Sequence, residues 1–165
     1  MCIKQLKKIS SQQLLWGLIL ICAIVLTMAY VMEHYFGILA CKMCHYERNT
    51  FLAGGGIAML CLFLPQPFQR HGILILGLIF MIGTLLAGYH VAIQNHWVDL
   101  PTFCASNDFS AFESVEALCE QLLQTPFVRC DQITWSLFGL SLAAYNALLS
   151  LLLTLLCWGW GLKRK

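Results

Sequence analysis

Charged residues are scarce in this sequence. Only 11% of its 165 residues are Asp, Glu, Lys or Arg, whereas 59% are hydrophobic. A soluble domain usually carries about 25% charged and about 45–50% apolar residues. This chain has too few polar residues to cover a soluble domain, so we expect a membrane protein. The net charge of +2 gives no sign of nucleic-acid binding.

A Gly-rich dinucleotide loop, internal repeats and low-complexity tracts are also missing from the sequence. The missing loop argues against a dinucleotide as the bound cofactor. Nothing divides the chain into repeated or separate units, so we expect residues 1–165 to form a single membrane domain.

The hydrophobic residues lie in four long runs, which predict an all-α membrane protein with four transmembrane helices arranged up and down. A helix needs about 20 residues to cross ~30 Å of hydrocarbon. The predicted spans are residues 14–34, 46–64, 72–94 and 136–162. A cleaved signal peptide is an alternative for the first run, but its apolar stretch is long and no small-x-small cleavage site follows.

The basic residues fix the direction of such a bundle. Lys and Arg collect on the cytoplasmic side of membrane proteins. Seven of the ten basic residues fall on one side of the four spans: Lys4, Lys7, Lys8, Arg70, Lys163, Arg164 and Lys165. We therefore expect both termini in the cytoplasm and the loops rich in acidic residues on the outer side.

The outer side also carries the only sizeable polar segment, residues 95–135. Within it, Ser110 and Glu113 form a capping box, apolar residues then recur at helical spacing, and Pro126 ends the pattern. This pattern predicts a short amphipathic helix on the membrane surface.

Eight of the nine cysteines separate into two groups on this map, and the ninth, Cys2, lies on the cytoplasmic side. Cys22, Cys61 and Cys157 lie inside spans, where a thiol usually packs as a small hydrophobe. Five others lie on the outer side, where disulfides form and persist: Cys41, Cys44, Cys104, Cys119 and Cys130. We interpret the outer group as redox or structural residues.

Cys41 and Cys44 form a C-x-x-C pair within the stretch ACKMCHYER, residues 40–48. Such pairs commonly contain one thiol of depressed pKa, and a helix N-terminus would stabilise its thiolate. A zinc clip built from this pair, His45 and a loop cysteine is an alternative. An inert disulfide is another.

Arg48 favours the redox interpretation. An Arg just inside an apolar span is usually functional or reaches back to the interface. Glu47 is its simplest partner. Alternatively, Arg48 holds a positive charge near a thiolate and near an electron acceptor in the bilayer, for which a membrane quinone is the most available candidate.

These residues resemble a known family. CKMCHYER is similar to the C-x-x-C-x-Y-E-R signature of the disulfide bond formation protein B (DsbB) family of quinone-dependent thiol oxidases. The similarity continues in order through GYHVAIQ at 88–94, LPTFC at 100–104, and the Cys, Trp and FGLS of residues 130–141. Cys119 is additional to this pattern.

The resemblance implies two catalytic disulfides, Cys41–Cys44 and Cys104–Cys130. A periplasmic thioredoxin-like oxidase would attack Cys104, the released Cys130 would attack Cys41, and Cys44 would pass the electrons to a bound quinone. Such exchanges proceed through mixed disulfides. The resemblance also implies the bacterial inner membrane as the location, with the redox loops in the periplasm.

The cofactor implied by the resemblance is ubiquinone or menaquinone, bound by Arg48, His90 and Gln94, and no metal is expected. Two alternatives stay open. One is a redox protein resembling the vitamin K epoxide reductase group, and the other is a non-enzymatic metal-binding or scaffolding membrane protein with four spans.

Overall fold

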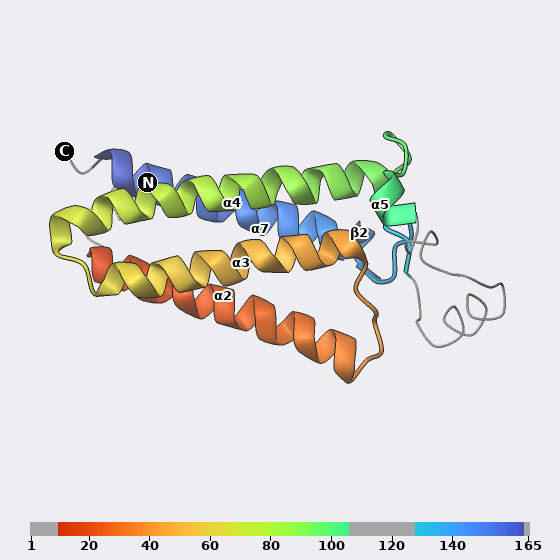
Figure 1. Ribbon diagram of the computed structural model, residues 1–165, viewed down its shortest axis with the longest axis horizontal. Coiled ribbons are helices and arrows are strands. Elements are labelled where there is room, and N and C mark those ends of the chain that lie inside the picture. Colours follow the sequence, from red (N-terminus) through yellow and green to blue (C-terminus); the bar gives the residue numbers. More distant parts are fainter. Residues whose placement is uncertain (1–9, 106–127, 164–165) are drawn as a thin grey trace, which may run out of the picture.

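The computed structural model describes residues 10–105 and 128–163. In these residues, four long helices lie side by side, with a short helix and a hairpin at one end (Figure 1). The elements are α2 (Ser11–His34), α3 (Lys42–Leu62), α4 (Gln66–Gln94), α5 (Thr102–Ala105), β1 (Ser136–Leu137), β2 (Leu140–Ser141) and α7 (Leu142–Lys163). Successive long helices run in opposite directions, so α2 begins and α7 ends at the same end of the bundle.

Three of the described helices, α2, α4 and α7, are long and apolar enough to cross a membrane. α3 has 21 residues, but its first two turns carry Lys42, Glu47 and Arg48. The prediction of a helical membrane protein is confirmed to this extent, and the fourth span stays a prediction.

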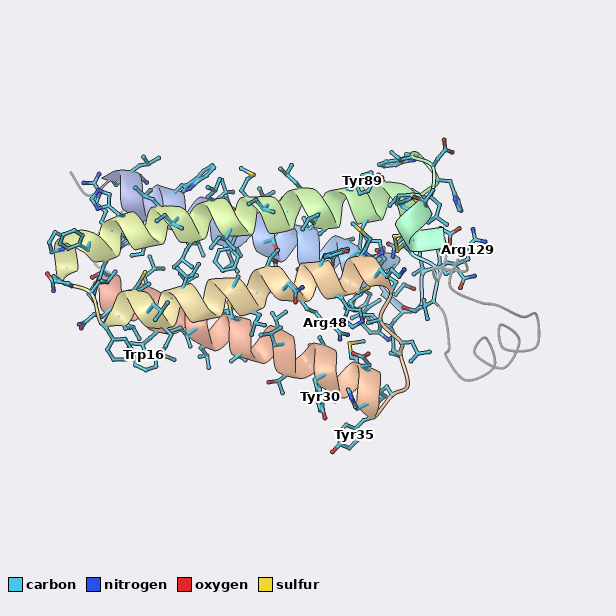
Figure 2. All side chains as sticks on the ribbon, viewed as in Figure 1. Trp16, Tyr30, Tyr35, Arg48, Tyr89 and Arg129 are labelled. Carbon is cyan, nitrogen blue, oxygen red and sulfur yellow. A yellow bond between two sulfur atoms is a disulfide. The ribbon has the colours of Figure 1, made fainter. Side chains whose placement is uncertain are left out.

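The outer surface of the bundle is apolar, which is typical of helices in contact with lipid. Large hydrophobic side chains are exposed along every long helix, including Leu20, Leu60, Leu85 and Leu155. Trp16 lies toward one end of the bundle, and Tyr30, Tyr35 and Tyr89 lie toward the other (Figure 2). Trp and Tyr at both ends are characteristic of the two membrane interfaces.

The long helices begin earlier than three of the predicted spans. Ser10 and Gln13 form a capping box at the start of α2. Cys41 caps α3, and Pro65 precedes α4, which accepts Pro67 in its first turn. Pro is tolerated there because the first-turn N–H groups have no intrahelical partner. Apolar periodicity cannot detect these polar and Pro-containing first turns.

The predicted span 136–162 is wrong at its start, because residues 136–141 form an antiparallel hairpin ahead of α7. Ser136 pairs with Ser141, and Leu137 pairs with Leu140. Phe138 and Gly139 both have positive φ angles, 50° and 79°, as the two central residues of a type I′ turn require. The Tyr145 hydroxyl donates a hydrogen bond to Leu137 O at 3.0 Å, which joins the hairpin to α7.

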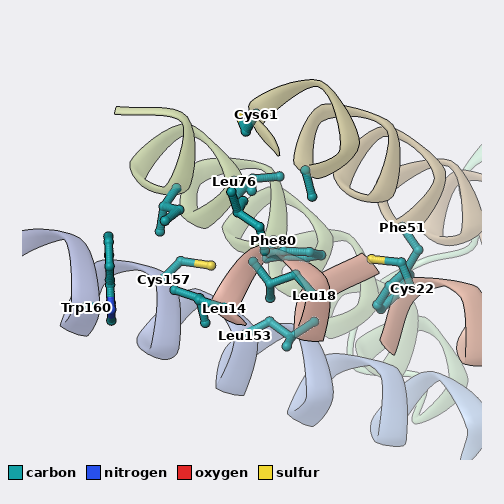
Figure 3. Packing of buried hydrophobic residues seen from close by; sticks show 13 residues of the cluster. Leu14, Leu18, Cys22, Phe51, Cys61, Leu76, Phe80, Leu153, Cys157 and Trp160 are labelled. Carbon is teal, nitrogen blue, oxygen red and sulfur yellow. The ribbon is translucent and has the colours of Figure 1, made fainter. Parts of the chain in front are cut away.

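A single apolar cluster holds the four long helices together (Figure 3). Its members come from all four helices and include Leu18, Phe51, Phe80 and Leu153. Close helix approach depends on glycine at Gly77, where a Cβ atom would lie 2.4 Å from the Trp158 ring. The cluster also contains three thiols that pack as small hydrophobes, as predicted: Cys22, Cys61 and Cys157.

Candidate active site

Cys41 and Cys44 lie where the chain enters α3, at the end of the bundle that also carries α5 and the hairpin (Figure 1). Cys41 is the N-cap residue, and its Sγ accepts a hydrogen bond from the backbone N–H of Cys44 at 3.4 Å. The thiol takes the place of the hydroxyl or carboxylate usual at this position. The cap therefore fixes one sulfur directly against the first turn of α3.

The two sulfur atoms lie 3.1 Å apart and share a hydrogen bond. A disulfide needs about 2.05 Å, so the predicted Cys41–Cys44 bridge is not formed in this structure, which holds the pair as a dithiol. The bridged form stays a prediction for the oxidised protein. The hydrogen bond with Cys44, and then the contact with His90, lower the pKa of the Cys41 thiol, although burial opposes this.

His90 connects Cys41 to a buried acid on the neighbouring helix. Its Nε2 lies 3.5 Å from Cys41 Sγ, and its Nδ1 lies 2.7 Å from Glu47 Oε1. An ionised carboxylate only accepts hydrogen bonds, so Nδ1 donates to Glu47 and Nε2 is left to face the sulfur. Asn146 of α7 donates to the other Glu47 oxygen. Three helices thus fix the orientation of one imidazole.

Arg48 does not pair with Glu47, the simplest partner from the sequence. Its guanidinium instead forms an ion pair with Glu33 of α2 and donates to the Ala29 carbonyl oxygen at 3.4 Å. Neighbouring residues of a helix point about 100° apart, so Glu47 and Arg48 face different helices. Both charges are satisfied by helix contacts at this end of the bundle.

Cys104 and Cys130 form a disulfide, with their Cα atoms 5.7 Å apart. Cys104 lies on α5 and Cys130 lies in the segment that leads to the hairpin. Both are 1% exposed and pack in one small cluster with Cys41, beside Cys44. The structure therefore gathers the four predicted catalytic cysteines, although more than 80 residues separate the first from the last.

A cavity of about 210 Å³ opens beside the dithiol. Side chains from α2, α3, α4 and α7 line it and are mostly apolar. The predicted binding residues Arg48, His90 and Gln94 all line it, together with both cysteines of the pair. Among the described residues, Gln94 Oε1 is the one buried side-chain oxygen or nitrogen without a hydrogen-bond partner. The site therefore offers an unused polar atom in an apolar space.

The sequence patterns did not predict the roles of Glu33 and Asn146 at the site. They also did not predict the hydrogen bond between Glu47 and His90. Their position within apolar helices could have identified them, because polar residues there usually face the interior of a bundle and mark a functional site. Their partners come from other helices, which periodicity does not identify. Cys119 and the predicted amphipathic surface helix lie outside the described residues.

Residues 41–45 also have the Cys-x-x-Cys-His spacing of c-type haem attachment. That arrangement uses the histidine that directly follows the second cysteine. Here His45 is exposed, whereas the histidine against Cys41 is the buried His90 of another helix. The observed contacts therefore do not follow that motif.

The family model for disulfide bond formation protein DsbB matches residues 11–160. The chain belongs to the DsbB family. DsbB relatives include disulfide bond formation protein B of Marinobacter nauticus, 29% identical over 151 residues, with 86% of this chain and 87% of the relative covered. The Azoarcus sp. protein of the same name is 30% identical over 134 residues, covering 77% and 78%. No solved structure gives a significant match.

Membership of the DsbB family identifies a membrane protein of disulfide bond formation and indicates thiol oxidoreductase chemistry. The three apolar helices agree with this class. The end of the bundle where a dithiol, a disulfide and a cavity meet is accordingly the candidate active site.

Proposed function

We propose that this DsbB-family chain is a membrane thiol:quinone oxidoreductase. In this proposal it reoxidises a periplasmic thioredoxin-like dithiol oxidase and passes the electrons to a membrane quinone. The observation that carries the proposal is the contact of the Cys104–Cys130 disulfide with the Cys41–Cys44 dithiol beside an apolar cavity. Two redox pairs in contact suit a relay, whereas a single structural bridge needs no second pair.

The proposal includes α3 as a fourth span of a protein in the bacterial inner membrane. At 1.5 Å per residue, its 21 residues extend about 31 Å, which is close to the ~30 Å hydrocarbon core. It packs against α2 and α4, both of which are apolar enough to span. Because Glu47 and Arg48 are paired at the Cys41 end, their charges are compatible with a position near the interface. With basic residues at the opposite end, both termini are cytoplasmic.

The first half of the proposed cycle is thiol–disulfide exchange. A thiolate of the reduced partner attacks Cys104, which forms a mixed disulfide and releases the Cys130 thiolate. The partner's second thiol resolves this bond and frees Cys104. Cys130 then attacks Cys41 of the bridged pair and releases the Cys44 thiolate. Cys104 finally attacks Cys130, which re-forms the Cys104–Cys130 disulfide and frees Cys41. Each exchange breaks one S–S bond and forms one, so the electron pair moves from the partner to Cys41 and Cys44. The packing of Cys41 with Cys104 and Cys130 supports the order.

The residues around the cavity fit a quinone ring. A bound quinone, ubiquinone or menaquinone, supplies a two-electron acceptor that takes up two protons. Cys44 lines the cavity with its sulfur next to Cys41, and Arg48 contributes a positive charge. Gln94 offers its unpaired Oε1 to a quinol hydroxyl. The apolar lining excludes water, which strengthens each of these polar contacts.

A quinone-reduction assay tests the proposal. Purified protein in detergent receives a reduced thioredoxin-like oxidase as donor and a soluble quinone as acceptor, and quinone absorbance is followed. We expect stoichiometric quinone loss and donor oxidation. Absence of quinone reduction with a fully folded, oxidised protein would refute the function.

A separate trapping experiment distinguishes the relay order. In Cys130→Ser, Cys104 is a free thiol, so the partner oxidase is supplied in its disulfide form. Cys104 attacks that disulfide, and because no Cys130 thiol is present to resolve the product, a mixed disulfide on Cys104 should accumulate, visible on non-reducing gels. Cys104→Ser is the matched control and should trap nothing at that position. Trapping on Cys44 instead would mean that the donor enters at the membrane pair.

A further inference from the structure

The Cys41–Cys44 dithiol has a third side chain beside it that could bind a metal ion, that of His90. The redox relay does not require a metal-binding role for His90. Cys41 Sγ, Cys44 Sγ and His90 Nε2 all lie within 4.8 Å of one another. Among the described residues they form the one group of three or more metal-binding side chains so arranged. All three residues also line the cavity or lie beside it.

The distances are close to those that a tetrahedral zinc site needs. With Zn–S near 2.3 Å and Zn–N near 2.0–2.1 Å, tetrahedral angles place two sulfurs about 3.8 Å apart and a sulfur and a nitrogen about 3.5 Å apart. The observed separations are 3.1 Å between the sulfurs and 3.5 Å from Cys41 Sγ to His90 Nε2. The sulfurs would need to separate by about 0.7 Å, and Cys44 Sγ lies within 4.8 Å of His90 Nε2.

The surroundings of His90 are those of a metal ligand. Zinc-bound histidines almost always donate their other ring N–H to a carboxylate or carbonyl, which fixes the tautomer. Glu47 accepts such a bond from Nδ1 at 2.7 Å and is itself held by Asn146. In the neutral imidazole with its proton on Nδ1, the lone pair of Nε2 is directed toward Cys41.

We propose that the dithiol form of Cys41 and Cys44, together with His90, binds one thiophilic divalent ion of the Zn²⁺ type. Both thiols release their protons, so the ion and two thiolates are neutral together, which suits a mostly apolar cavity. Sulfur and imidazole ligands select zinc over magnesium or calcium. The three protein ligands leave one tetrahedral position for water from the cavity.

Metal binding then opposes oxidation of the pair. The ion holds both sulfurs as thiolates in coordinate bonds, and no S–S bond forms until it leaves. The bridged pair offers no thiolates and does not bind the ion. Zinc on the outer side of the membrane would therefore hold the protein in its reduced state, reversibly and without electron transfer.

The test uses the full chain with Cys104→Ser, Cys119→Ser and Cys130→Ser, so that Cys41–Cys44 is the one outer pair that changes with redox state. After reduction, or after oxidation with diamide, the protein is incubated with Zn²⁺ and desalted, and bound metal is counted by mass spectrometry. We expect one ion per reduced chain and none per oxidised chain. Cd²⁺ binding should add the ultraviolet sulfur-to-cadmium charge-transfer band.

Matched variants identify the ligands. His90→Gln and Cys44→Ser should each weaken binding at least tenfold, and Glu47→Gln should weaken it about 10–100-fold. His45→Gln is the control, because His45 follows the pair but is exposed, and it should bind as the parent does. Gel filtration and helicity establish that each variant is folded.

Equal binding by the reduced and oxidised chains, or loss of binding in His45→Gln but not in His90→Gln, would overturn the site. This inference uses the dithiol of the proposed function, but the two fail separately. Quinone reduction by chelator-treated protein without metal binding would refute only the metal site. Metal binding without quinone reduction would refute only the redox function.

Discussion

The two ends of the helix bundle use the same residue type in opposite ways. In the apolar half, Cys61 and Cys157 are buried among Leu76, Leu153 and Trp160 (Figure 3). At the cysteine end, which we define by the Cys41–Cys44 and Cys104–Cys130 pairs, each sulfur lies against another sulfur. Burial alone therefore does not separate the thiols packed among hydrophobic residues from those of the candidate site, because Cys41 is as buried as Cys61. Their neighbours separate them.

Buried polar groups show the same contrast. In the apolar half, Ser11 donates to Gln69, and Gln69 donates to the Leu64 carbonyl at 3.0 Å, so both polar side chains are satisfied. At the cysteine end, Glu47 and His90 are buried together, and Gln94 keeps an unpaired oxygen. A buried polar atom without a partner costs free energy. At the cysteine end, the atom that carries this cost is Gln94 Oε1, and it lies at the cavity, where a bound ligand could donate a hydrogen bond to it.

The largest expected effect on turnover comes from replacing one cysteine at each end of the bundle with alanine. Cys44→Ala removes a redox sulfur, and we expect quinone reduction to fall to background while the bundle stays folded. Cys61→Ala should keep full turnover and lose about 1 kcal/mol of stability from the small cavity. Turnover and thermal unfolding in detergent measure both. Equal turnover in Cys44→Ala and Cys61→Ala would contradict the proposed difference between the thiols at the two ends.

The next prediction concerns helix packing in the apolar half. Gly77→Val places a Cβ 2.4 Å from Trp158 ring atoms, and we expect a destabilisation of about 1–3 kcal/mol or more. Gly56→Ala is the control, because its Cβ meets nothing within 4 Å, and it should gain about 0.5–1 kcal/mol. Unfolding midpoints in one detergent compare them. A stable Gly77→Val variant would show that the contact with α7 is loose.

The sequence predicted the parts of this fold that depend on long local patterns. Apolar runs located the long helices. The C-x-x-C spacing with Arg48, together with the resemblance to the DsbB family, indicated the candidate site. The hairpin at residues 136–141 was not predicted, because each of its strands has two residues. That is too short for the alternation of apolar and polar residues that indicates a strand. Positive φ at Phe138 also has no reliable local signal, since bulky residues rarely adopt it.

Partners across helices were the least predictable part of the site. Adjacent charges suggested a pair of Glu47 with Arg48, but sequence neighbours on a helix do not face each other. The true partners, Glu33 for Arg48 and His90 for Glu47, depend on which helices are neighbours in space. Gathering the two cysteine pairs likewise required the bundle itself, since spacing alone does not select a pairing.

A smaller effect, on quinone affinity, is expected from replacing Arg48 at the cysteine end. Arg48→Ala removes a positive charge beside the cavity, and we expect apparent quinone affinity to weaken about tenfold, or ~1.4 kcal/mol, with little change in thermal unfolding. Glu33→Gln is the matched control. It leaves the Arg48 charge in place and keeps an acceptor for its N–H groups, so quinone affinity should not weaken.

Steady-state quinone reduction over a range of quinone concentrations measures both Arg48 and Glu33 variants. An unchanged quinone affinity in Arg48→Ala would refute a binding role for the charge. Equal weakening in Glu33→Gln would instead show that the ion pair, and not the cation itself, shapes the cavity.

The smallest expected effect is at Cys119, whose replacement by Ala should leave turnover unchanged. Five outer cysteines make two pairs and leave one over, and loop closure cannot choose among them, because doubling a loop costs only about 0.6 kcal/mol. The observed Cys104–Cys130 bridge leaves Cys119 without a partner in that pair. The helical pattern of its segment predicts that Cys119 lies on the apolar face, where a desolvated thiol is a poor nucleophile. Mass mapping of the non-reduced protein and the turnover of Cys119→Ala check this, and a resting bridge to Cys119 or lost turnover would contradict it.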